Sequence, residues 1–268
     1  MDDGSPLLVN SLNFKDALNE SLDSMIVEVG MRYGSPSIES AINKLEESGV
    51  NQIILCPMFP QYAQATTGSC ITFASKILDS RNIKYKTITG FFREEFFIES
   101  VVNKIKSSKE YHDSEMILFS FHGLPERHVD KVYKDGLCKD NDCEHGINDE
   151  NVFCYKATCY ETAIQLAKRF KLKEEDYTVG FQSRLGRGWV EPFSDEIITD
   201  LAKKGAKKLL VFSPAFVADC LETIIEIGDE YQELFEEHGG EKVQLVESLN
   251  SSDTFVHGLK EMILKRSL

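Results

Sequence analysis

The sequence predicts an α/β fold built on parallel sheets. Short runs rich in β-branched and aromatic residues alternate with amphipathic stretches of helical length. Strands that alternate with helices in this way form βαβ units, and these units build parallel sheets. The chain has 268 residues, of which 42% are hydrophobic, and this is enough for a packed core in one large or two ordinary domains.

Seven runs are predicted to be strands, with helices between them. The strand runs lie at 25–33, 52–59, 83–92, 116–123, 177–183, 208–214 and 242–248. The amphipathic stretches lie at 37–48, 96–106, 159–170, 195–204 and 253–265, and a further helix is predicted to begin near Asp219. Gly49, Gly205 and Gly239 stand where three of these helices would end, a position that glycine often takes.

The charged segment at 106–114 is the best boundary between two halves of the chain, with three predicted strands before it and four after it. We therefore expect a first α/β domain at 1–112 and a second at 113–249. The last helix could pack on either half, and we assign residues 250–268 to the first domain. Region 130–159 is polar and rich in cysteine, and it interrupts the alternation of strands and helices inside the second domain.

Charge and composition argue against several classes of protein. With 30 Lys and Arg against 44 Asp and Glu, the net charge of −14 argues against nucleic acid and anionic lipid as main partners. No apolar run reaches the ~18 residues of a transmembrane helix, and the N-terminus has acids where a signal peptide has bases. We expect a cytoplasmic protein whose seven cysteines are free thiols or metal ligands. The sequence indicates no oligomeric state.

Ligands of open α/β sheets bind outside the carboxyl ends of the strands, so the residues that end the predicted strands are candidates for chemistry. His122 ends one such run and is followed by Gly123, Leu124 and Pro125. An imidazole at the mouth of a cleft can accept a proton near neutral pH or bind a metal. The alternative is a structural histidine that caps the next helix.

Three acids, Glu222, Glu226 and Glu230, are spaced four residues apart along the helix predicted from Asp219. On an α-helix this spacing forms one stripe, and like charges at that spacing destabilise the helix unless something positive lies against them. A solvated acidic face is one interpretation. The other is a track of carboxylates for a divalent cation. Oxygen ligands alone suit Mg²⁺ or Ca²⁺, whereas imidazole with carboxylate suits Fe(II), Zn²⁺ or Mn²⁺.

Four cysteines follow the pattern C-x4-C-x10-C-x4-C inside the irregular region. They are Cys138, Cys143, Cys154 and Cys159. Four cysteines this close together in a reducing compartment are typical of a metal site. The spacing differs from the C-x2-C pairs of zinc ribbons and fits an iron–sulfur cluster at least as well. The alternative is a set of unrelated free thiols.

Two aromatic residues in loops after predicted strands, Trp189 and Tyr62, are candidates for stacking on a flat apolar ligand. Arg184 and Arg187 lie in the same loop as Trp189 and could meet ligand carboxylates there. Alternatively, the tryptophan attaches this loop to the body of the protein. The fingerprints of nucleotide-binding loops and serine hydrolases are missing from the sequence.

Six segments, taken together and in order, resemble the ferrochelatase family, whose members insert Fe(II) into a porphyrin late in haem synthesis. They are GMRYGSPSI, PMFPQYAQATTGS, ILFSFHGLPERH, GFQSRLGRGWVEP, SPAFVADCLETIIEIGDEY and VESLNSSDTF. The ordered set is a more specific signal than any one segment. The resemblance implies two doubly wound α/β domains of similar topology, with the porphyrin in the cleft between them.

The resemblance also implies substrates and residue roles. The substrates would be ferrous iron and either protoporphyrin IX or coproporphyrin III. His122 matches the histidine thought to take pyrrole protons or to bind the iron, and Glu222 matches the catalytic glutamate across the cleft. Glu226 and Glu230 match an acidic row proposed as a path for metal or protons. The residues that match the porphyrin pocket are Tyr62, Trp189 and Phe216.

The chain departs from the family pattern in three places. It begins where the family usually has several dozen residues behind it, including a glycine-rich first strand. Cys220 stands where many relatives have histidine, two residues before Glu222. The cysteines at 138–159 are absent from many relatives and resemble the group of bacterial members that carry a 2Fe–2S cluster. Two other functions stay open: a chelatase for another tetrapyrrole or metal, such as sirohydrochlorin or cobalt, and a tetrapyrrole- or iron–sulfur-binding protein without turnover.

Overall fold

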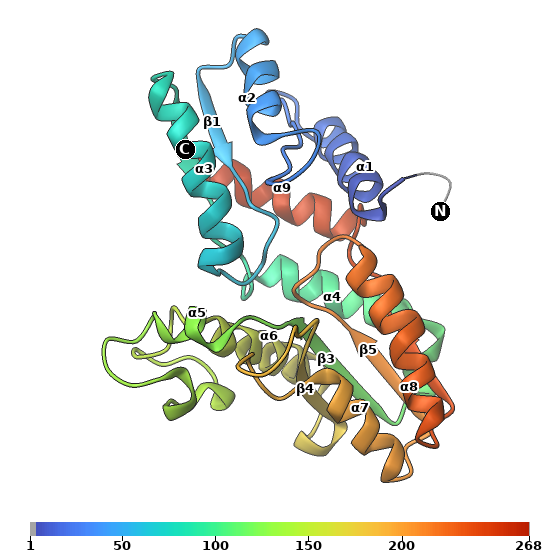
Figure 1. Cartoon of the computed structure of the whole chain (residues 1–268). Helices are drawn as coiled ribbons and strands as arrows, with labels where there is room; N and C mark the ends of the chain where they lie inside the picture. The colour runs from blue at the N-terminus through green and yellow to red at the C-terminus, as the bar shows by residue number, and fades with distance from the viewer. Residues whose placement is uncertain (1–3, 268) are drawn as a thin grey trace.

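A computed structural model, which describes residues 4–267, shows a mixed α/β fold with two parallel sheets (Figure 1). Strands β1 (Gln52–Leu55) and β2 (Lys84–Thr87) pair in one sheet. The other sheet has the order β4-β3-β5-β6, and its pairs are parallel as the sequence predicts. Its strands are β3 (Met116–His122), β4 (Tyr177–Gln182), β5 (Lys208–Phe212) and β6 (Lys242–Leu245).

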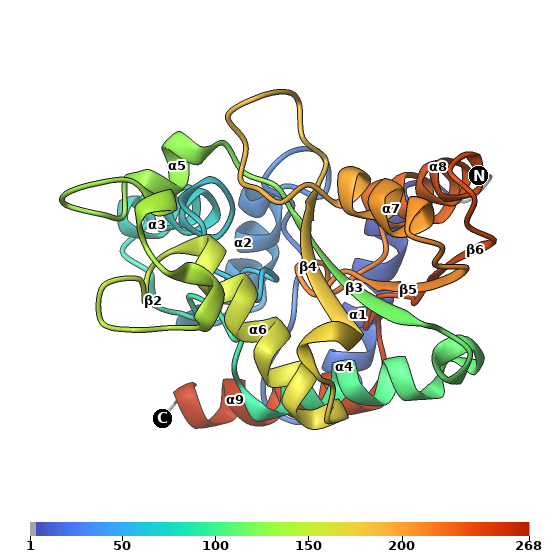
Figure 2. The same cartoon turned by 90° about the horizontal axis from the view of Figure 1, so that it is seen from below.

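Helices connect the strands and cover both sheets (Figures 1 and 2). The α-helices are α1 (Pro6–Ser21), α2 (Ile38–Glu47), α3 (Ser69–Ser80), α4 (Glu95–Ser107), α5 (Glu126–Asp130), α6 (Tyr155–Phe170), α7 (Ser194–Lys203), α8 (Tyr231–Glu237) and α9 (Asp253–Ser267). Two segments are π-helices, η1 (Gln64–Gly68) and η6 (Glu222–Glu230). Short 3₁₀ helices lie at Lys109–His112, Cys138–Asp140, Cys143–His145 and Glu174–Asp176.

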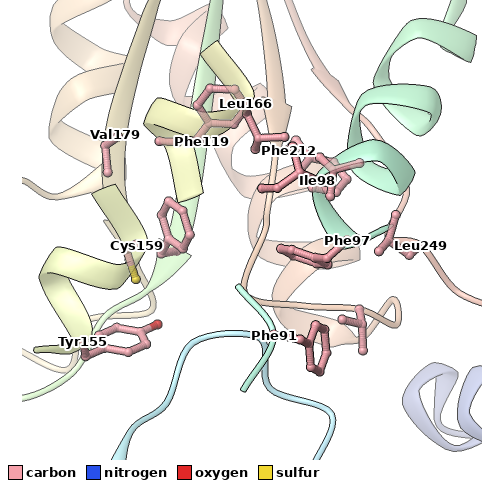
Figure 3. Close-up of a cluster of buried hydrophobic side chains, with 14 of the residues drawn as sticks. Phe91, Phe97, Ile98, Phe119, Tyr155, Cys159, Leu166, Val179, Phe212 and Leu249 are labelled. Carbon is pink, nitrogen blue, oxygen red and sulfur yellow. The ribbon is translucent and has the colours of Figure 1, made fainter. Parts of the chain in front are cut away.

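One buried hydrophobic cluster spans both halves of the chain. It includes Leu18 of α1, Phe97 of α4, Phe119 of β3 and Phe255 of α9. Figure 3 shows part of this cluster, in which side chains from α4, α6 and the β3–β5 region face one another. Helix α9 packs against both α1 and α4 (Figures 1 and 2). The predicted boundary near residue 112 therefore separates the two sheets, while the hydrophobic core continues across it.

The strand predicted at 25–33 is wrong. Residues 25–30 have no regular structure, and Met31 forms an isolated bridge with Ser37. The Asn19 side chain of α1 makes two hydrogen bonds with the backbone of Val27, at 2.7 and 3.0 Å. An extended run becomes a strand only where a neighbouring strand supplies its ladder of hydrogen bonds. Within residues 4–267, β1 pairs with β2 alone, so this run has no ladder partner.

The other six predicted strands are confirmed, although each one ends earlier than its apolar run. The predicted helices at 37–48, 96–106, 159–170, 195–204 and 253–265 correspond to α2, α4, α6, α7 and α9. Gly49, Gly205 and Gly239 have φ angles of +77°, +100° and +100°, as expected for glycines that end helices. Helix α1 was not predicted. No helix in the described range 4–267 is long and apolar enough to span a bilayer.

Candidate active site

A large, mainly apolar cavity of 1180 Å³ is lined by both His122 and Glu222. His122 is the last residue of β3, and Glu222 begins η6, which follows β5. Strands β3 and β5 are neighbours in the sheet, so their carboxyl ends open on the same edge. The topology therefore brings two residues that are distant in sequence to one cavity. Further lining comes from α1, α9 and the segments 24–33, 49–59 and 215–218.

The His122 imidazole is held in one orientation. Its Nδ1 lies 2.6 Å from the carbonyl oxygen of Gly123, so Nδ1 carries a proton and donates it to that carbonyl. In the neutral ring Nε2 is then free to accept a proton. The Tyr155 hydroxyl, from the start of α6, donates to the backbone oxygen of His122 at 2.9 Å. A Cβ at Gly123 would lie only 2.9 Å from Gln182 O, so the chain needs glycine directly after the histidine.

Glu222 is exposed, and its backbone oxygen accepts a hydrogen bond from Gln182 Nε2 at 2.9 Å. Cys220 is buried next to it and also lines the cavity. Burial, together with the neighbouring Glu222 carboxylate, raises the pKa of Cys220 to about 12, so this thiol stays protonated at neutral pH. The cavity wall thus offers one carboxylate and one neutral thiol on the side of η6.

The other two acids of the predicted stripe have different surroundings. Glu226 is half-buried and does not line the cavity; its carboxylate accepts hydrogen bonds from β4, from the residue after β4 and from α8. Glu230 is exposed. These hydrogen bonds turn the Glu226 carboxylate toward the end of β4 and away from the cavity. The structure places Glu222 alone of the three acids among the residues that line the cavity.

The predicted pocket residues are divided between the cavity and its surroundings. Phe216 lines the cavity, and its ring centre lies 6.0 Å from that of His122. Trp189 does not line the cavity in this structure, but it pairs with Pro125 and packs against Gly123 beside the histidine. Tyr62 lies two residues before η1, and its hydroxyl donates to Oε1 of Gln64, the first residue of η1, at 3.0 Å.

Arg184, the predicted partner of ligand carboxylates, is engaged within the protein. Its guanidinium binds Asp195 at 2.6 Å and Glu196 at 2.9 Å, and it lies 4.0 Å from the ring centre of Phe193. Arg184 does not line the cavity. The basic side chains that do so, in the part of the chain that the structure describes, are Lys15 and Arg32.

Two lining residues carry more of the site than the sequence analysis assigned to them. Arg32 lies 4.6 Å from the ring centres of both Tyr33 and Phe73, and its Nε donates to Ser69 Oγ at 3.0 Å. Its place at the end of an apolar run was the signal that could have found it. Tyr155 had no such signal, since it follows an irregular segment and contacts His122 only through the fold.

Three of the four predicted cysteine ligands form a compact group, called the thiol group below. The sulfurs of Cys138, Cys143 and Cys154 lie 3.6 to 3.9 Å from one another, and all three residues are buried. A tetrahedral metal with bonds of ~2.3 Å to sulfur would hold its sulfurs ~3.8 Å apart. The thiol group therefore fits three corners of such a site.

Neighbouring groups favour a charged sulfur in the thiol group. Hydrogen bonds from Cys138 and Cys143 hold the pKa of Cys154 well below its usual value. The Tyr133 hydroxyl lies 3.3 Å from the sulfur of Cys143, and the Cys138 backbone N–H donates to Asp130 Oδ1 at 2.8 Å. The 3₁₀ turns that carry Cys138 and Cys143 are thus fixed by local contacts.

Cys159, the fourth predicted ligand, is not placed with the thiol group. It lies one turn after Tyr155 on α6, and Figure 3 shows both side chains among the residues of the hydrophobic cluster. Burial raises the pKa of the Cys159 thiol well above its usual value. Cys159 therefore behaves as a core residue in this structure.

Comparisons with known proteins agree on one family. A family model described as ferrochelatase matches residues 1–267. A curated ferrochelatase of Coxiella burnetii (strain Dugway 5J108-111) is 41% identical over 270 residues, covering 99% of this chain and 75% of the relative. A ferrochelatase of Bdellovibrio bacteriovorus is 39% identical over 267 residues, covering 98% of this chain and 79% of the relative. The chain spans about three quarters of the length of these relatives.

Solved structures support the same fold at low identity. SirB from Bacillus subtilis with Fe³⁺ has a TM-score of 0.66 and 12% identity, covering 96% of this chain and 88% of that one. The sirohydrochlorin chelatase SirB from the subspecies spizizenii, in complex with cobalt, has a TM-score of 0.63 and 11% identity, covering 97% of this chain and 88% of that one. This likeness shows a chelatase-like fold.

Proposed function

The chain belongs to the ferrochelatase family, and we propose from that premise how its cavity carries out the reaction. The enzyme is a metal chelatase that inserts Fe(II) into a porphyrin in haem synthesis. The observation that carries the assignment of residues is that one apolar cavity is lined by both His122 and Glu222. A flat apolar ligand fits such a lining, and the two polar side chains can reach its centre.

His122 serves as the base in this proposal. A porphyrin loses two N–H protons as the cation enters, so a proton acceptor must lie at the height of the pyrrole nitrogens. The bond from Nδ1 to Gly123 O leaves Nε2 as the free acceptor, and the Tyr155 bond fixes the backbone behind the ring. Glu222 supplies the carboxylate that meets the cation. Phe216, beside His122, is proposed to stack on the macrocycle.

The remaining predicted site residues keep more limited roles. Trp189 and Tyr62 would contact the porphyrin only after the loops that carry them move toward the cavity. Arg184 would have to leave Asp195 and Glu196 to meet a ligand carboxylate. The metal role predicted for Glu226 and Glu230 stays a prediction.

A chelatase for a tetrapyrrole with more carboxylates, such as sirohydrochlorin, is the second candidate, because the fold is shared with SirB. Such a ligand demands many cations around it. Lys15 and Arg32 are the basic residues that line the described cavity, and Lys15 already pairs with Asp16 at 2.9 Å. The lining therefore favours a porphyrin with few carboxylates.

The test is anaerobic insertion of Fe(II), or of Zn(II) as a probe, into protoporphyrin IX, followed through the visible bands of the porphyrin. Coproporphyrin III and sirohydrochlorin are assayed in parallel. We expect turnover with a porphyrin and none with sirohydrochlorin. Turnover with sirohydrochlorin alone would favour the second candidate, and binding of all three without turnover would favour a binding protein.

We further propose that the thiol group holds a metal centre. Three thiols at 3.6 to 3.9 Å suit a single tetrahedral ion with one further ligand. A 2Fe–2S cluster takes four protein ligands, for which Cys159 is the predicted fourth. Metal and sulfide analysis distinguishes the two: a cluster gives iron, labile sulfide and a visible spectrum that dithionite bleaches, whereas zinc gives none of these. Cys159→Ser should abolish a cluster and leave a zinc site loaded.

We propose that the enzyme works in the cytoplasm. All seven cysteines are free thiols, three of them in a group suited to a metal, and this is the state expected of a reducing compartment. Fractionation of cells that express the protein, with thiol labelling before lysis, tests this assignment.

A further inference from the structure

A buried polar network joins the carboxyl ends of β3, β4 and β5. At its centre is Gln182, the last residue of β4, which is 1% exposed. Its Oε1 accepts hydrogen bonds from Ser120 Oγ at 2.8 Å and Ser213 Oγ at 3.1 Å. Its Nε2 donates to the backbone oxygen of Glu222 at 2.9 Å and to Glu226 Oε2 at 3.4 Å. The network therefore reaches the catalytic segment at two points.

The carboxylate of Glu226 is surrounded by donors. Oε1 accepts from the backbone N–H of Ser183 at 2.7 Å and from the Tyr231 hydroxyl at 3.1 Å. Oε2 accepts from Ser183 Oγ at 2.5 Å and from Gln182 Nε2. A carboxylate offers about four lone-pair sites, and all of them are directed to these donors. Burial and the charge of Glu226 raise the pKa of Tyr231, which keeps its hydroxyl protonated as a donor.

Ser183 is held in an unusual backbone conformation by the same contact. Its φ angle is +61°, in the left-handed region that residues other than glycine rarely adopt. Such a strained conformation is kept only where contacts with the surrounding structure hold it in place. Here both the N–H and the hydroxyl of Ser183 bind Glu226, so the carboxylate fixes the chain at the end of β4.

We propose that Glu226 is a positioning residue that anchors η6 on the end of β4 and so sets the place of Glu222 in the cavity. Glu226 lies one turn after Glu222 on the same π-helix, and it faces Ser183 and Tyr231 rather than the cavity. A ligand on the path of the metal needs free lone pairs, and Glu226 has none in this arrangement. This inference rests on the proposed function for its effect on the reaction, while the anchor itself belongs to the fold.

The two roles predict different kinetics. Loss of a metal ligand raises the KM for the metal. Loss of an anchor misplaces Glu222 and lowers kcat, and a misplacement of ~1 Å can cost ~100-fold in rate. Tyr231→Phe removes a donor to Glu226 without removing any ligand. An anchor is weakened by this change, whereas a metal ligand would only gain a free lone pair.

The experiment measures Zn(II) insertion into protoporphyrin IX at varied zinc concentration. It compares the wild type with the variants Glu226→Ala, Glu226→Gln and Tyr231→Phe. We expect kcat to fall ~10- to 100-fold for Glu226→Ala, less for Glu226→Gln and ~2- to 5-fold for Tyr231→Phe. The KM for zinc should stay within about twofold of the wild-type value in each case. Glu226→Gln should rescue part of the rate, because its amide oxygen still accepts from Ser183. The matched control is Glu233→Gln, at an exposed position of α8, with unchanged kcat.

A zinc KM raised tenfold or more by both Glu226 variants, with Tyr231→Phe unaffected, would overturn the inference and make Glu226 a ligand. A second measurement needs no turnover and separates this inference from the proposed function. In urea unfolding, the double variant Glu226→Gln with Tyr231→Phe should be no less stable than Glu226→Gln alone. Additive losses of stability would show that the anchor does not exist, whatever the wild type does to porphyrins.

Discussion

The thiol group and the cavity are assembled in opposite ways. The thiol group draws its three cysteines from one irregular segment, and its turns are fixed by short-range contacts such as that of Cys138 with Asp130. The cavity joins His122 and Glu222, which are far apart in sequence and meet because β3 and β5 are adjacent. One site therefore depends on local chain geometry, and the other depends on the order of strands in a sheet.

This difference predicts separate functions with a weak connection. The two regions meet at Tyr155, which follows Cys154 in the chain and donates to the backbone oxygen of His122. A change in the cavity should stop the reaction and leave the thiol group loaded. A change in the thiol group should remove its metal and disturb the reaction only through Tyr155.

The largest effect should follow from His122→Ala. Loss of the proposed base should lower kcat for metal insertion by ~10³-fold, within the usual range for general base catalysis. Porphyrin affinity, measured by absorbance titration, should change by less than about threefold, and the metal content of the thiol group should not change. His257→Ala, on the exposed face of α9, is the control. Equal loss of binding and turnover would make His122 a structural residue.

A smaller effect is expected from Cys154→Ser. The thiol group should lose most of its metal, which is measured by elemental analysis of the purified protein. Metal insertion should fall by no more than ~10-fold, because the helix start that carries Tyr155 is also held by the hydrophobic core. Cys70→Ser, at a thiol of the cavity wall outside the thiol group, should keep the metal. If Cys154→Ser were as inactive as His122→Ala, the thiol group and the cavity would not have separate functions.

Tyr155→Phe tests the connection itself. The variant removes one hydrogen bond to the backbone behind His122, worth ~1 kcal/mol, and should lower kcat ~5-fold. Metal in the thiol group should remain at the wild-type amount. Tyr160→Phe, on the same helix, should leave kcat unchanged. If Tyr155→Phe removes the metal from the thiol group, the thiol group and the cavity act as a single unit.

The smallest effect should follow from Arg184→Ala. The partly exposed ion pairs with Asp195 and Glu196 contribute about 0.5–1 kcal/mol to the free energy of unfolding, so the melting temperature should drop slightly. Porphyrin affinity should stay within twofold. A tenfold loss of affinity would show instead that Arg184 turns to a ligand carboxylate, as the sequence predicts.

The sequence could predict both sites to the extent that each follows a simple rule. Cysteine spacing indicated the thiol group, the strand-end rule singled out His122, and the family resemblance placed Glu222 across the cleft from it. Cysteine spacing could not predict the orientation of Cys159, because this orientation depends on which face of α6 packs into the core. The spacing of the acids could not predict the surroundings of Glu226, because its partners Ser183 and Tyr231 reach it only through the fold. The run at 25–33 has the composition of a strand, but pairing is decided by its neighbours.

The bond between His122 Nδ1 and the Gly123 carbonyl has a consequence for proton stoichiometry. Each porphyrin releases two protons, yet the His122 imidazole can accept only one, at Nε2. The second proton needs another acceptor, for which Glu222 is the proposed group: Glu28 of the cavity wall is paired with Lys44, whereas Glu222 has no ion pair within residues 4–267. Both groups must discharge to water before the next porphyrin arrives. Turnover can therefore be no faster than the transfer of these two protons to water. A dependence of kcat on buffer concentration would reveal these transfers.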